Sequence, residues 1–415
     1  MSKPPQNSRK PKSAPKPTMA QNVSGVFRNP IQSVVRWFDY YSLHQSPVFY
    51  RLVMLIGLMI VVGLLMVLSA SNVVSIKATG DPFAEFRSQL LYTLAGLLAM
   101  IVISMRKVEV IRKFSISFFV FTIFLQLLVQ VPGIGFSVGG NRNWLAIGSF
   151  TFQPSELMKL GMILGIAAWI SPHLDSLWDW RKTVFPLAVF GFLPALLVLG
   201  LSNDLGTTAV MIVFVLALAI LIGVPWKIIG GFVALGGLAF LGASAASPNR
   251  INRILSAFGF GVEGDDLNWQ TKHSEWALAS GGLFGTGLGD SKMKWGWIPE
   301  VENDFIFSVV GEESGFLGAV VVLILFFMLA RYLRKVSISS ATGFGSIAVT
   351  GIMLWITLQA FINIAVVLGL MPVIGVPLPL FSRGGSSMLA VLMALGVVLA
   401  VERDQARPKR SVRKK

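Results

Sequence analysis

Carboxylates beside a long apolar segment are the side chains of this sequence best suited to chemistry. Asp304 directly precedes an apolar run that begins at Phe305, and Glu300 and Glu302 stand just before it. An acid at a hydrocarbon boundary must pair, face a cavity or take up a proton, which makes it a candidate functional residue. Asp304 could exchange a proton with a substrate hydroxyl. The alternative is that Asp304 or Asn303 only caps the helix that follows.

Two further acids and a glycine-rich stretch belong to the same part of the chain. Glu312 and Glu313 lie about two helical turns into the apolar run. We expect both to be structural, one paired with a buried cation and the other facing the interior of a helix bundle. The stretch 281–289 holds five glycines, which permit tight turns and a close approach of a ligand to the backbone. It lacks the strand, helix and lysine of a nucleotide-binding loop, so turn formation is the favoured interpretation.

A second polar patch holds cations and an acid just before another apolar segment. Arg142 and Trp144 lie in a stretch rich in Gly and Asn, and Gln153 is followed by a proline that predicts a helix start. Glu156 suits the positive end of that helix, and Lys159 lies one turn deeper. The two charges could simply neutralise each other at their i, i+3 spacing. Arg142 has no acid near it in the sequence, so with Lys159 it could instead clamp an anionic head group.

A third patch, residues 371–387, combines three prolines within eight residues with a Gly-Gly-Ser-Ser sequence. The pattern predicts a re-entrant turn and then a helix start whose free N–H groups could bind phosphate, with Arg383 and Ser386 beside them. Close helix packing by Gly and Ser explains part of this pattern equally well. Gln359 and Asn363 add polar groups to the apolar segment before the patch.

These patches must be held by helices that cross a membrane. Of the 415 residues, 54% are hydrophobic and 13% are charged, and the mean hydropathy of +0.71 indicates lipid as the solvent. The apolar stretches are long and continuous, which excludes an outer-membrane barrel. We predict an all-α integral membrane protein with ten transmembrane helices. The segments are 52–71, 90–105, 114–131, 157–170, 184–201, 207–222, 228–245, 305–330, 345–370 and 384–401. Asp204 is predicted to cap the sixth segment.

The distribution of charge predicts the orientation of these spans. Ten spans place both termini on one side, where 25 of the 35 Lys and Arg residues lie, whereas 14 of the 20 acids lie on the other side. By the positive-inside rule, both termini are cytoplasmic. The net charge of +15 is thus a topology signal, and nucleic acid is not a predicted partner.

Three regions follow from this topology. Residues 1–51 form a basic, largely disordered tail with an interfacial segment, and residues 404–415 form a second basic cytoplasmic tail. Residues 52–403 form the membrane domain, with one long external loop, 246–304, between spans seven and eight. The tails either hold to anionic membrane lipid or dock cytoplasmic partners.

Residue types that hold metal ions are scarce. The sequence has no Cys, and its three His are far apart, so it predicts no disulfide, no thiol nucleophile and no metal site built from Cys or His. The sequence requires no cofactor, although a divalent cation could take part.

The order of these motifs resembles the SEDS family (shape, elongation, division and sporulation), the ten-span peptidoglycan glycosyltransferases whose two main branches are FtsW and RodA. The resemblance covers about Leu52 to Arg403. Each motif alone is weak, but their order on the predicted sides of the membrane is specific. The stretches that carry it are Ser69–Ser71, Asn141–Trp144, Gln153–Lys159, Asp204–Thr207, Gly285–Gly289, Pro299–Phe307, Gly311–Glu313 and Leu378–Ser387.

The resemblance implies polymerisation of lipid II into glycan strands at the external face of a bacterial plasma membrane. The C4 hydroxyl of one disaccharide attacks C1 of another chain and expels undecaprenyl pyrophosphate with inversion. Asp304, at the position of the family's catalytic aspartate, would take the hydroxyl proton. Arg142, Lys159 and Arg383 are candidate cations for the departing pyrophosphate. The residues assigned to substrate binding are Arg142, Trp144, Gln153, Glu156, Lys159, Gln270, Glu300, Arg383 and Ser386.

Two residues depart from the family pattern, because Glu302 stands where a His is usual and Arg383 where an aromatic residue is common. The basic tails favour the FtsW branch and synthesis at the division septum, with RodA-type elongation as the alternative. The implied partners are a class B penicillin-binding protein and other divisome proteins. A lipid II flippase and a division scaffold without catalysis are further alternatives, against which the external position of Asp304 argues.

Overall fold

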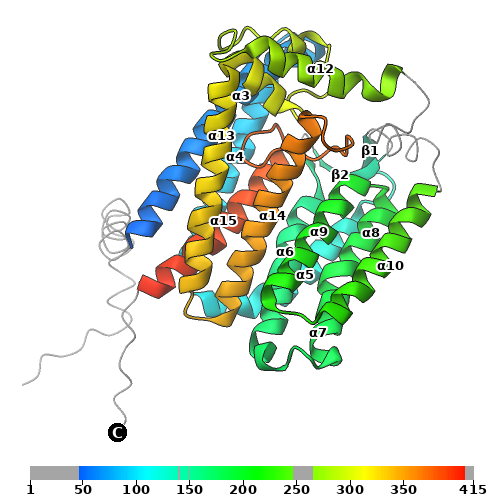
Figure 1. The fold of residues 1–415 in the computed structure, drawn as a ribbon, viewed down its shortest axis with the longest axis vertical. Coiled ribbons are helices and arrows are strands. Elements are labelled where there is room, and N and C mark those ends of the chain that lie inside the picture. Colours follow the sequence, from blue (N-terminus) through cyan, green and yellow to red (C-terminus); the bar gives the residue numbers. More distant parts are fainter. Residues whose placement is uncertain (1–45, 139–140, 149, 246–264, 407–415) are drawn as a thin grey trace, which may run out of the picture. The chain divides into compact units, whose positions relative to one another are not determined.

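The computed structural model describes residues 46–138, 141–148, 150–245 and 265–406, which form a bundle of long helices (Figure 1). Eight of the described helices are long and apolar enough to cross a membrane. Each of the ten predicted segments overlaps a helical stretch, so the all-α membrane fold is confirmed. The count of ten spans stays a prediction, because α5 (Val108–Leu128) and α10 (Trp226–Ala245) fall outside that set of eight.

The fifth predicted span is a composite of shorter pieces. A π-helical segment, Leu187–Phe192, joins α7 to α8. Pro186 and Pro194 flank this segment, and each lacks the N–H that a regular helix would use at its position.

The other helices are α3 (Pro47–Thr79), α4 (Ala84–Ser104), α6 (Pro154–Ile170), α7 (Trp180–Pro186), α8 (Leu193–Ser202), α9 (Leu205–Ile222), α12 (Asp265–Gly281), α13 (Ile306–Ser339), α14 (Gly343–Val367) and α15 (Gly385–Ala406), with short 3-10 turns at Ser171–Ser176 and Met293–Trp295.

The first described helix begins earlier than the predicted span. α3 starts at Pro47 because Ser46 Oγ accepts a hydrogen bond from the Phe49 N–H (3.1 Å) and proline suits the first helical turn. Ser46 also donates a hydrogen bond to Glu402 near the end of α15, so the start of α3 and the end of α15 lie together. Most of the two predicted tails, at 1–45 and 407–415, lies outside the described residues.

Small residues allow α15 to lie against α4 in the interior of the bundle. A Cβ atom on Gly96 of α4 would lie 2.7 Å from the Leu392 side chain. One on Gly396 of α15 would lie 2.8 Å from the Met100 carbonyl oxygen. Larger side chains at these glycines would push the two helices apart, as expected where membrane helices pack through small residues. α5 packs against α6, and α13 packs against α14.

A small antiparallel sheet lies at one end of this bundle, and the sequence did not predict it. Its strands pair in the order β1-β2-β3, and Phe136 lies opposite Trp144. The ladder has an irregularity between Phe136 and Ser137. Two of the strands have only four and three residues, and the seven residues of the middle strand, NRNWLAI, do not alternate between polar and apolar, so none gives a strand signal in the sequence. The strands are β1 (Gly135–Val138), β2 (Asn141–Ile147) and β3 (Phe150–Phe152).

α13 is interrupted at Gly315, whose φ of 68° is not helical. The glycine-rich stretch satisfies the backbone groups that this break frees. The Phe316 N–H donates to the Gly282 carbonyl (2.8 Å), and the Thr286 N–H donates to the Glu312 carbonyl (2.9 Å). The predicted turns are confirmed by four residues with positive φ, Gly282, Gly285, Gly287 and Gly289.

The predicted loop 246–304 contains a helix, α12 (Asp265–Gly281), that the sequence did not predict. α12 lies across the end of the bundle, above α13 and α14 (Figure 1), whereas residues 246–264 lie outside the described part. Ser274 Oγ donates to the Val367 carbonyl at the end of α14 (2.8 Å). A Cβ atom on Gly281 would lie 2.0 Å from the Gly311 carbonyl oxygen of α13. α12 is therefore fixed to the ends of both helices.

Candidate active site

Asp304 lies in the turn before α13 and is partly exposed. The N-cap residue of α13 is Phe305, and no side chain caps this helix, so the capping interpretation of Asp304 and Asn303 is wrong. No described side chain donates a hydrogen bond to the Asp304 carboxylate or forms an ion pair with it. The carboxylate is thus available to a substrate.

The surroundings of Asp304 change its acidity. The surrounding protein shields this partly exposed carboxylate from much of the water, and this desolvation raises its pKa from 3.8 to about 7, with additional contributions from the negative charges of Glu300, Asp204 and Glu302. A carboxyl group with a pKa near neutrality is a much better general base than an ordinary aspartate, because it both binds and releases a proton near the working pH.

A residue of α14 fixes the backbone at Asp304 and links it to the connection between α14 and α15. Asn363 of α14 donates its amide hydrogens to two carbonyl oxygens, those of Asp304 (2.7 Å) and Val376 (2.7 Å). Gly375 in the same connection has a φ of 68°, and a Cβ atom there would lie 3.4 Å from Asp304 Oδ2. Asn363 therefore holds the proline-rich segment and the candidate base together.

Lys159 is buried in a network and does not lie on an open surface. Its side chain is 1% exposed, and Nζ lies 2.8 Å from both Glu156 Oε1 and Gln359 Oε1. Nζ also lies over the Trp355 ring, 5.2 Å from its centroid. The structure thus contains the local pair with Glu156. Gln359 donates in turn to the Pro377 carbonyl (2.9 Å), so this network ends at the proline-rich segment.

Asp204 caps α9 as predicted and gathers the second polar patch. Its carboxylate accepts hydrogen bonds from the Thr207 N–H (2.9 Å) and from the side chain of Asn143 on β2 (2.6 Å). The Gln153 amide lies 3.5 Å from the same carboxylate. Burial is the main cause that raises the pKa of Asp204. Asp204 therefore ties the start of α9 to the small sheet.

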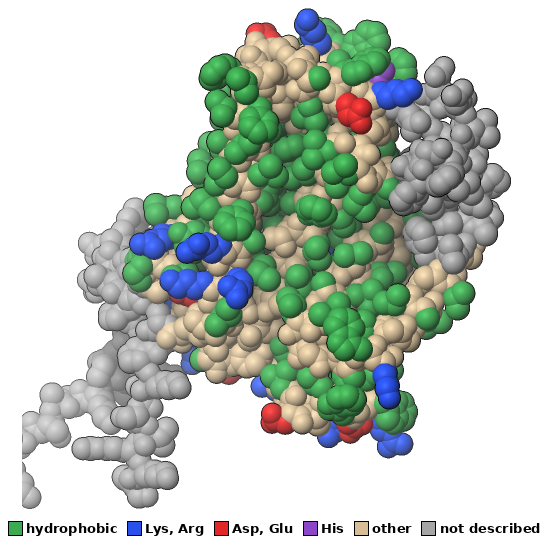
Figure 2. Space-filling model, in the orientation of Figure 1, with side chains coloured by type: hydrophobic (Ala, Val, Ile, Leu, Met, Phe, Trp, Pro, Cys, Tyr) green, Lys and Arg blue, Asp and Glu red, His purple; other side chains and the backbone are tan. Residues whose placement is uncertain are grey.

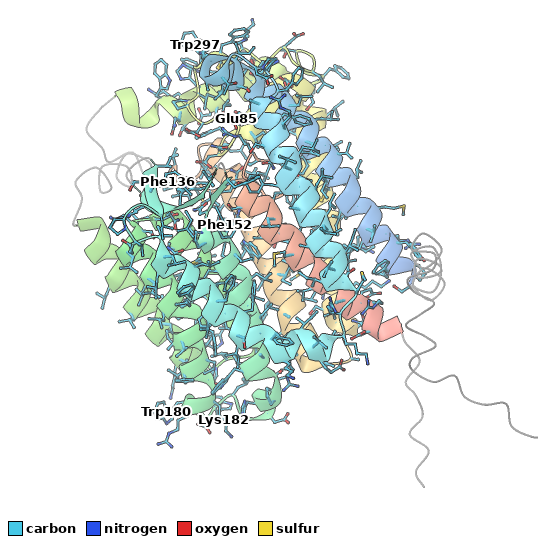
Figure 3. The ribbon with its side chains drawn as sticks, turned by 180° about the vertical axis from the view of Figure 1, so that it is seen from behind. Glu85, Phe136, Phe152, Trp180, Lys182 and Trp297 are labelled. Atoms are coloured by element: carbon cyan, nitrogen blue, oxygen red, sulfur yellow. The ribbon has the colours of Figure 1, made fainter. Side chains whose placement is uncertain are left out.

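Arg383 joins two acids at the edge of the site. Its guanidinium lies 2.6 Å from Glu85 of α4 and 3.0 Å from Glu302, and its backbone N–H donates to the Glu302 carbonyl (2.8 Å). Burial raises the pKa of Glu302 although Arg383 opposes the shift. Glu85, one of these two partners of Arg383, lies toward the same end of the helix bundle as Trp297. Trp180 and Lys182 lie at the opposite end of the bundle (Figure 3).

The remaining predicted residues surround this region with fewer contacts. Arg142 on β2 is partly buried and forms no ion pair with a described acid. Trp144 packs near Phe136, with ring centroids 6.4 Å apart. Ser386 at the start of α15 accepts a hydrogen bond from the Gln153 N–H (2.9 Å). Two further predicted residues are Gln270, partly exposed on α12, and Glu300, which has a φ of 53° and accepts a hydrogen bond from Asn303.

Glu312 and Glu313 are structural, as expected. Glu313 lies 3.4 Å from Lys294 Nζ and accepts a hydrogen bond from Ser69 (2.6 Å). Glu312 accepts hydrogen bonds from Ser291 Oγ (2.5 Å) and the Lys292 N–H (2.9 Å). Both carboxylates hold the segment that precedes Asp304 against α13.

The described part of the chain contains no cluster of side chains that could hold a metal ion. Among residues 46–138, 141–148, 150–245 and 265–406, no three His, Asp or Glu side chains form a group that could hold a metal ion. The expectation that no cofactor is required stays a prediction.

Several residues that shape the site carried no sequence signal of their role. Asn143 and Glu85 bond to residues far away in the chain, and nothing in their local sequence indicates a partner. For Asn363 and Gln359, the sequence indicates only two polar residues in an apolar segment. A polar amide in a membrane helix predicts a buried hydrogen bond, but it does not predict the acceptor.

The chain matches a protein family described as "Cell cycle protein", which groups FtsW, RodA and SpoVE, over residues 50–407. It belongs to this family. Stage V sporulation protein E of Bacillus subtilis is 37% identical over 85% of this chain and 96% of its own length. A probable peptidoglycan glycosyltransferase FtsW from Geobacter sp. is also 37% identical, over 82% of this chain and 92% of its own.

Solved structures of the same family share the fold. The rod shape determining protein RodA of Thermus thermophilus aligns with a TM-score of 0.63 at 27% identity, covering 88% of this chain and 99% of its own. A chain from a peptidoglycan synthase complex, whose structure concerns the coordination of polymerisation and crosslinking, aligns with a TM-score of 0.69 at 28% identity over 88% of this chain and 99% of its own. The SEDS-like architecture expected from the motifs is confirmed.

Proposed function

We propose that this protein is a peptidoglycan glycosyltransferase that polymerises lipid II at the external membrane face, with Asp304 as the general base. The observation that carries the proposal is the Asp304 carboxylate itself, which is partly exposed, has no described partner and has a pKa raised to about 7. The family relationship supports it, because relatives of similar length carry the name peptidoglycan glycosyltransferase.

The reaction needs one proton transfer and the stabilisation of one leaving group. The C4 hydroxyl of one disaccharide attacks C1 of another, the bond from C1 to the pyrophosphate oxygen breaks, and the hydroxyl proton passes to Asp304. Inversion at C1 follows from direct displacement. Asp304 then releases the proton to water, and its pKa near neutrality makes this return rapid.

The three candidate cations take different roles in this mechanism. Arg142 is the one that lies partly buried without a described acidic partner, so we assign it to the departing pyrophosphate. Lys159 instead positions the proline-rich segment through Gln359. Arg383, held between two carboxylates, joins the segment before Asp304 to α4. Trp144, Gln153, Gln270, Glu300 and Ser386 are assigned to the sugar and peptide parts of the substrate.

The biological setting is part of the proposal. We infer a multi-pass protein of the bacterial plasma membrane that acts at the division septum, since FtsW proteins are prominent among its relatives. Its partner would be a crosslinking enzyme of the class B penicillin-binding type together with divisome proteins. The similarity to a chain from a synthase complex that couples polymerisation to crosslinking supports such a partner.

The test uses the purified full chain with its cognate crosslinking partner and lipid II. We expect the wild type to form glycan polymer and Asp304→Asn to form none while still binding the partner. Near-normal polymer from Asp304→Asn would refute the role of Asp304. Transfer of lipid II across a liposome bilayer without any polymer would support the flippase, and neither activity would support the scaffold.

A further inference from the structure

A groove between α13 and α14 lies far from the candidate active site and has no role in the proposed reaction. It encloses about 780 Å³. It lies toward the end of α13 that is remote from Asp304, and Ser340–Thr342 connects the two helices there. The residues that line it are Phe327, Ala330, Arg331, Arg334, Lys335, Ile338, Ser339, Met353 and Thr357.

The basic part of the groove lacks counter-ions from the protein. Arg331, Arg334 and Lys335 are exposed, and none of them forms an ion pair with an acid in the described part of the chain. Their spacing of three and four residues places all three on one face of α13, where like charges repel each other. The opposite wall, from α14, adds Met353 and Thr357 and no acid. The site is therefore complementary to an anion.

Apolar side chains line the groove on both sides of these charges along α13, and Ser339 and Thr357 add two hydroxyl groups. Phe327 and Ile338 are 69% and 70% exposed, and the Met353 side chain lines the same space. Phe327 and Lys335 are eight residues apart on one helix, a distance of about 12 Å along its axis. Figure 2 shows Lys and Arg side chains among hydrophobic ones over this end of α13. One cavity thus offers three basic side chains and, on the Phe327 side of them, an apolar wall.

We propose that this groove binds an anionic phospholipid, with its phosphate at Arg331, Arg334 and Lys335 and an acyl chain along Phe327 and Met353. Basic pockets between transmembrane helices on the cytoplasmic side are suited to acidic head groups. A free phosphate would use only the three basic side chains and would leave the apolar wall uncovered. The proposal is independent of the reaction at Asp304, since the groove shares no residue with that site.

The experiment measures lipid retained by the full chain after purification from bilayers that contain equal amounts of phosphatidylglycerol and phosphatidylcholine, by native mass spectrometry. We expect the wild type to retain phosphatidylglycerol preferentially. Arg331→Gln, Arg334→Gln and Lys335→Gln combined should lower this retention about tenfold or more. Ala330→Phe, which fills the groove and leaves all three charges, should also release the lipid.

The matched control also neutralises three basic residues. It combines Lys107→Gln, directly before α5, with Arg112→Gln and Lys113→Gln on α5. It should retain phosphatidylglycerol like the wild type. The proposal fails if the control loses as much lipid as the groove variant, or if Ala330→Phe retains a normal amount. It also fails if single Cys residues in the groove crosslink to a transmembrane helix of the partner, which would assign the groove to a protein.

Discussion

The carboxylates around the start of α13 differ in whether the protein supplies them with hydrogen-bond donors. Glu312 and Glu313 are buried and accept hydrogen bonds from Ser291, the Lys292 N–H and Ser69, with Lys294 as a nearby cation. Asp304, about two turns earlier, is partly exposed and has no described donor. A carboxylate with its donors in place stabilises a conformation, whereas one left without donors can accept a proton from a substrate.

The candidate cations show the same contrast. Lys159 has Glu156, Gln359 and the Trp355 ring as partners, and its side chain is 1% exposed. Arg142 has no described acidic partner and is partly buried. The type of a residue therefore matters less than whether the fold already satisfies it.

The largest expected effect is at the unpaired acid. Asp304→Ala should lower the polymerisation rate by about 10² to 10⁴, the usual contribution of a general base. Asp304→Glu should retain part of the rate because it keeps a carboxylate at the site. Both variants should melt within a few degrees of the wild type, since no described side chain depends on Asp304. A loss of folded protein in Asp304→Ala would place Asp304 among the structural acids.

The paired acids should behave in the reverse way. Glu313→Gln leaves the buried Lys294 charge uncompensated, which costs about 3 to 5 kcal/mol of stability. Thermal melting in detergent should show this loss, while the rate per folded molecule stays near that of the wild type. Adding Lys294→Met should recover much of the stability, because it removes the unpaired charge. A specific loss of rate with unchanged melting would contradict the comparison.

A smaller effect is expected at the open cation. Arg142→Ala should slow polymerisation roughly ten- to a hundredfold, because a charge-assisted contact of about 1.5 to 3 kcal/mol is lost in the transition state. Arg142→Lys should retain more activity than Arg142→Ala. Melting temperatures should remain unchanged in both. Equal rates in all three proteins, measured at saturating lipid II, would remove Arg142 from the site.

Sequence reasoning located the helices well, because long apolar segments are a strong local signal. It also identified Asp204 as a helix cap and the glycine-rich stretch as turns, since both depend on neighbouring residues. The sheet and α12 were not predicted, because β1 and β3 are very short, β2 lacks an alternating pattern and α12 is largely polar. Asp304 was singled out as an acid beside hydrocarbon, and its family motif strengthened that interpretation.

The contacts that complete the site could not be predicted. Lys159 and Gln359 lie 200 positions apart in the chain, and Asn363 and Asp304 lie 59 apart. A sequence fixes local spacing, as it did for Glu156 and Lys159, but it does not state which distant amide will meet which charge. The choice between a local pair and a free cation at Lys159 therefore required the structure.

The most direct test of Asp304 as the general base is the pH dependence of the polymerisation rate under single-turnover conditions. Because the base must be ionised and its pKa is raised to about 7, the rate should fall as the pH drops below about 7 and level off above it. Glu300→Gln removes a negative charge that raises this pKa, so its profile should shift to lower pH. A flat profile between pH 5 and pH 8 (roughly two units below and one unit above that pKa), unchanged by Glu300→Gln, would contradict the account.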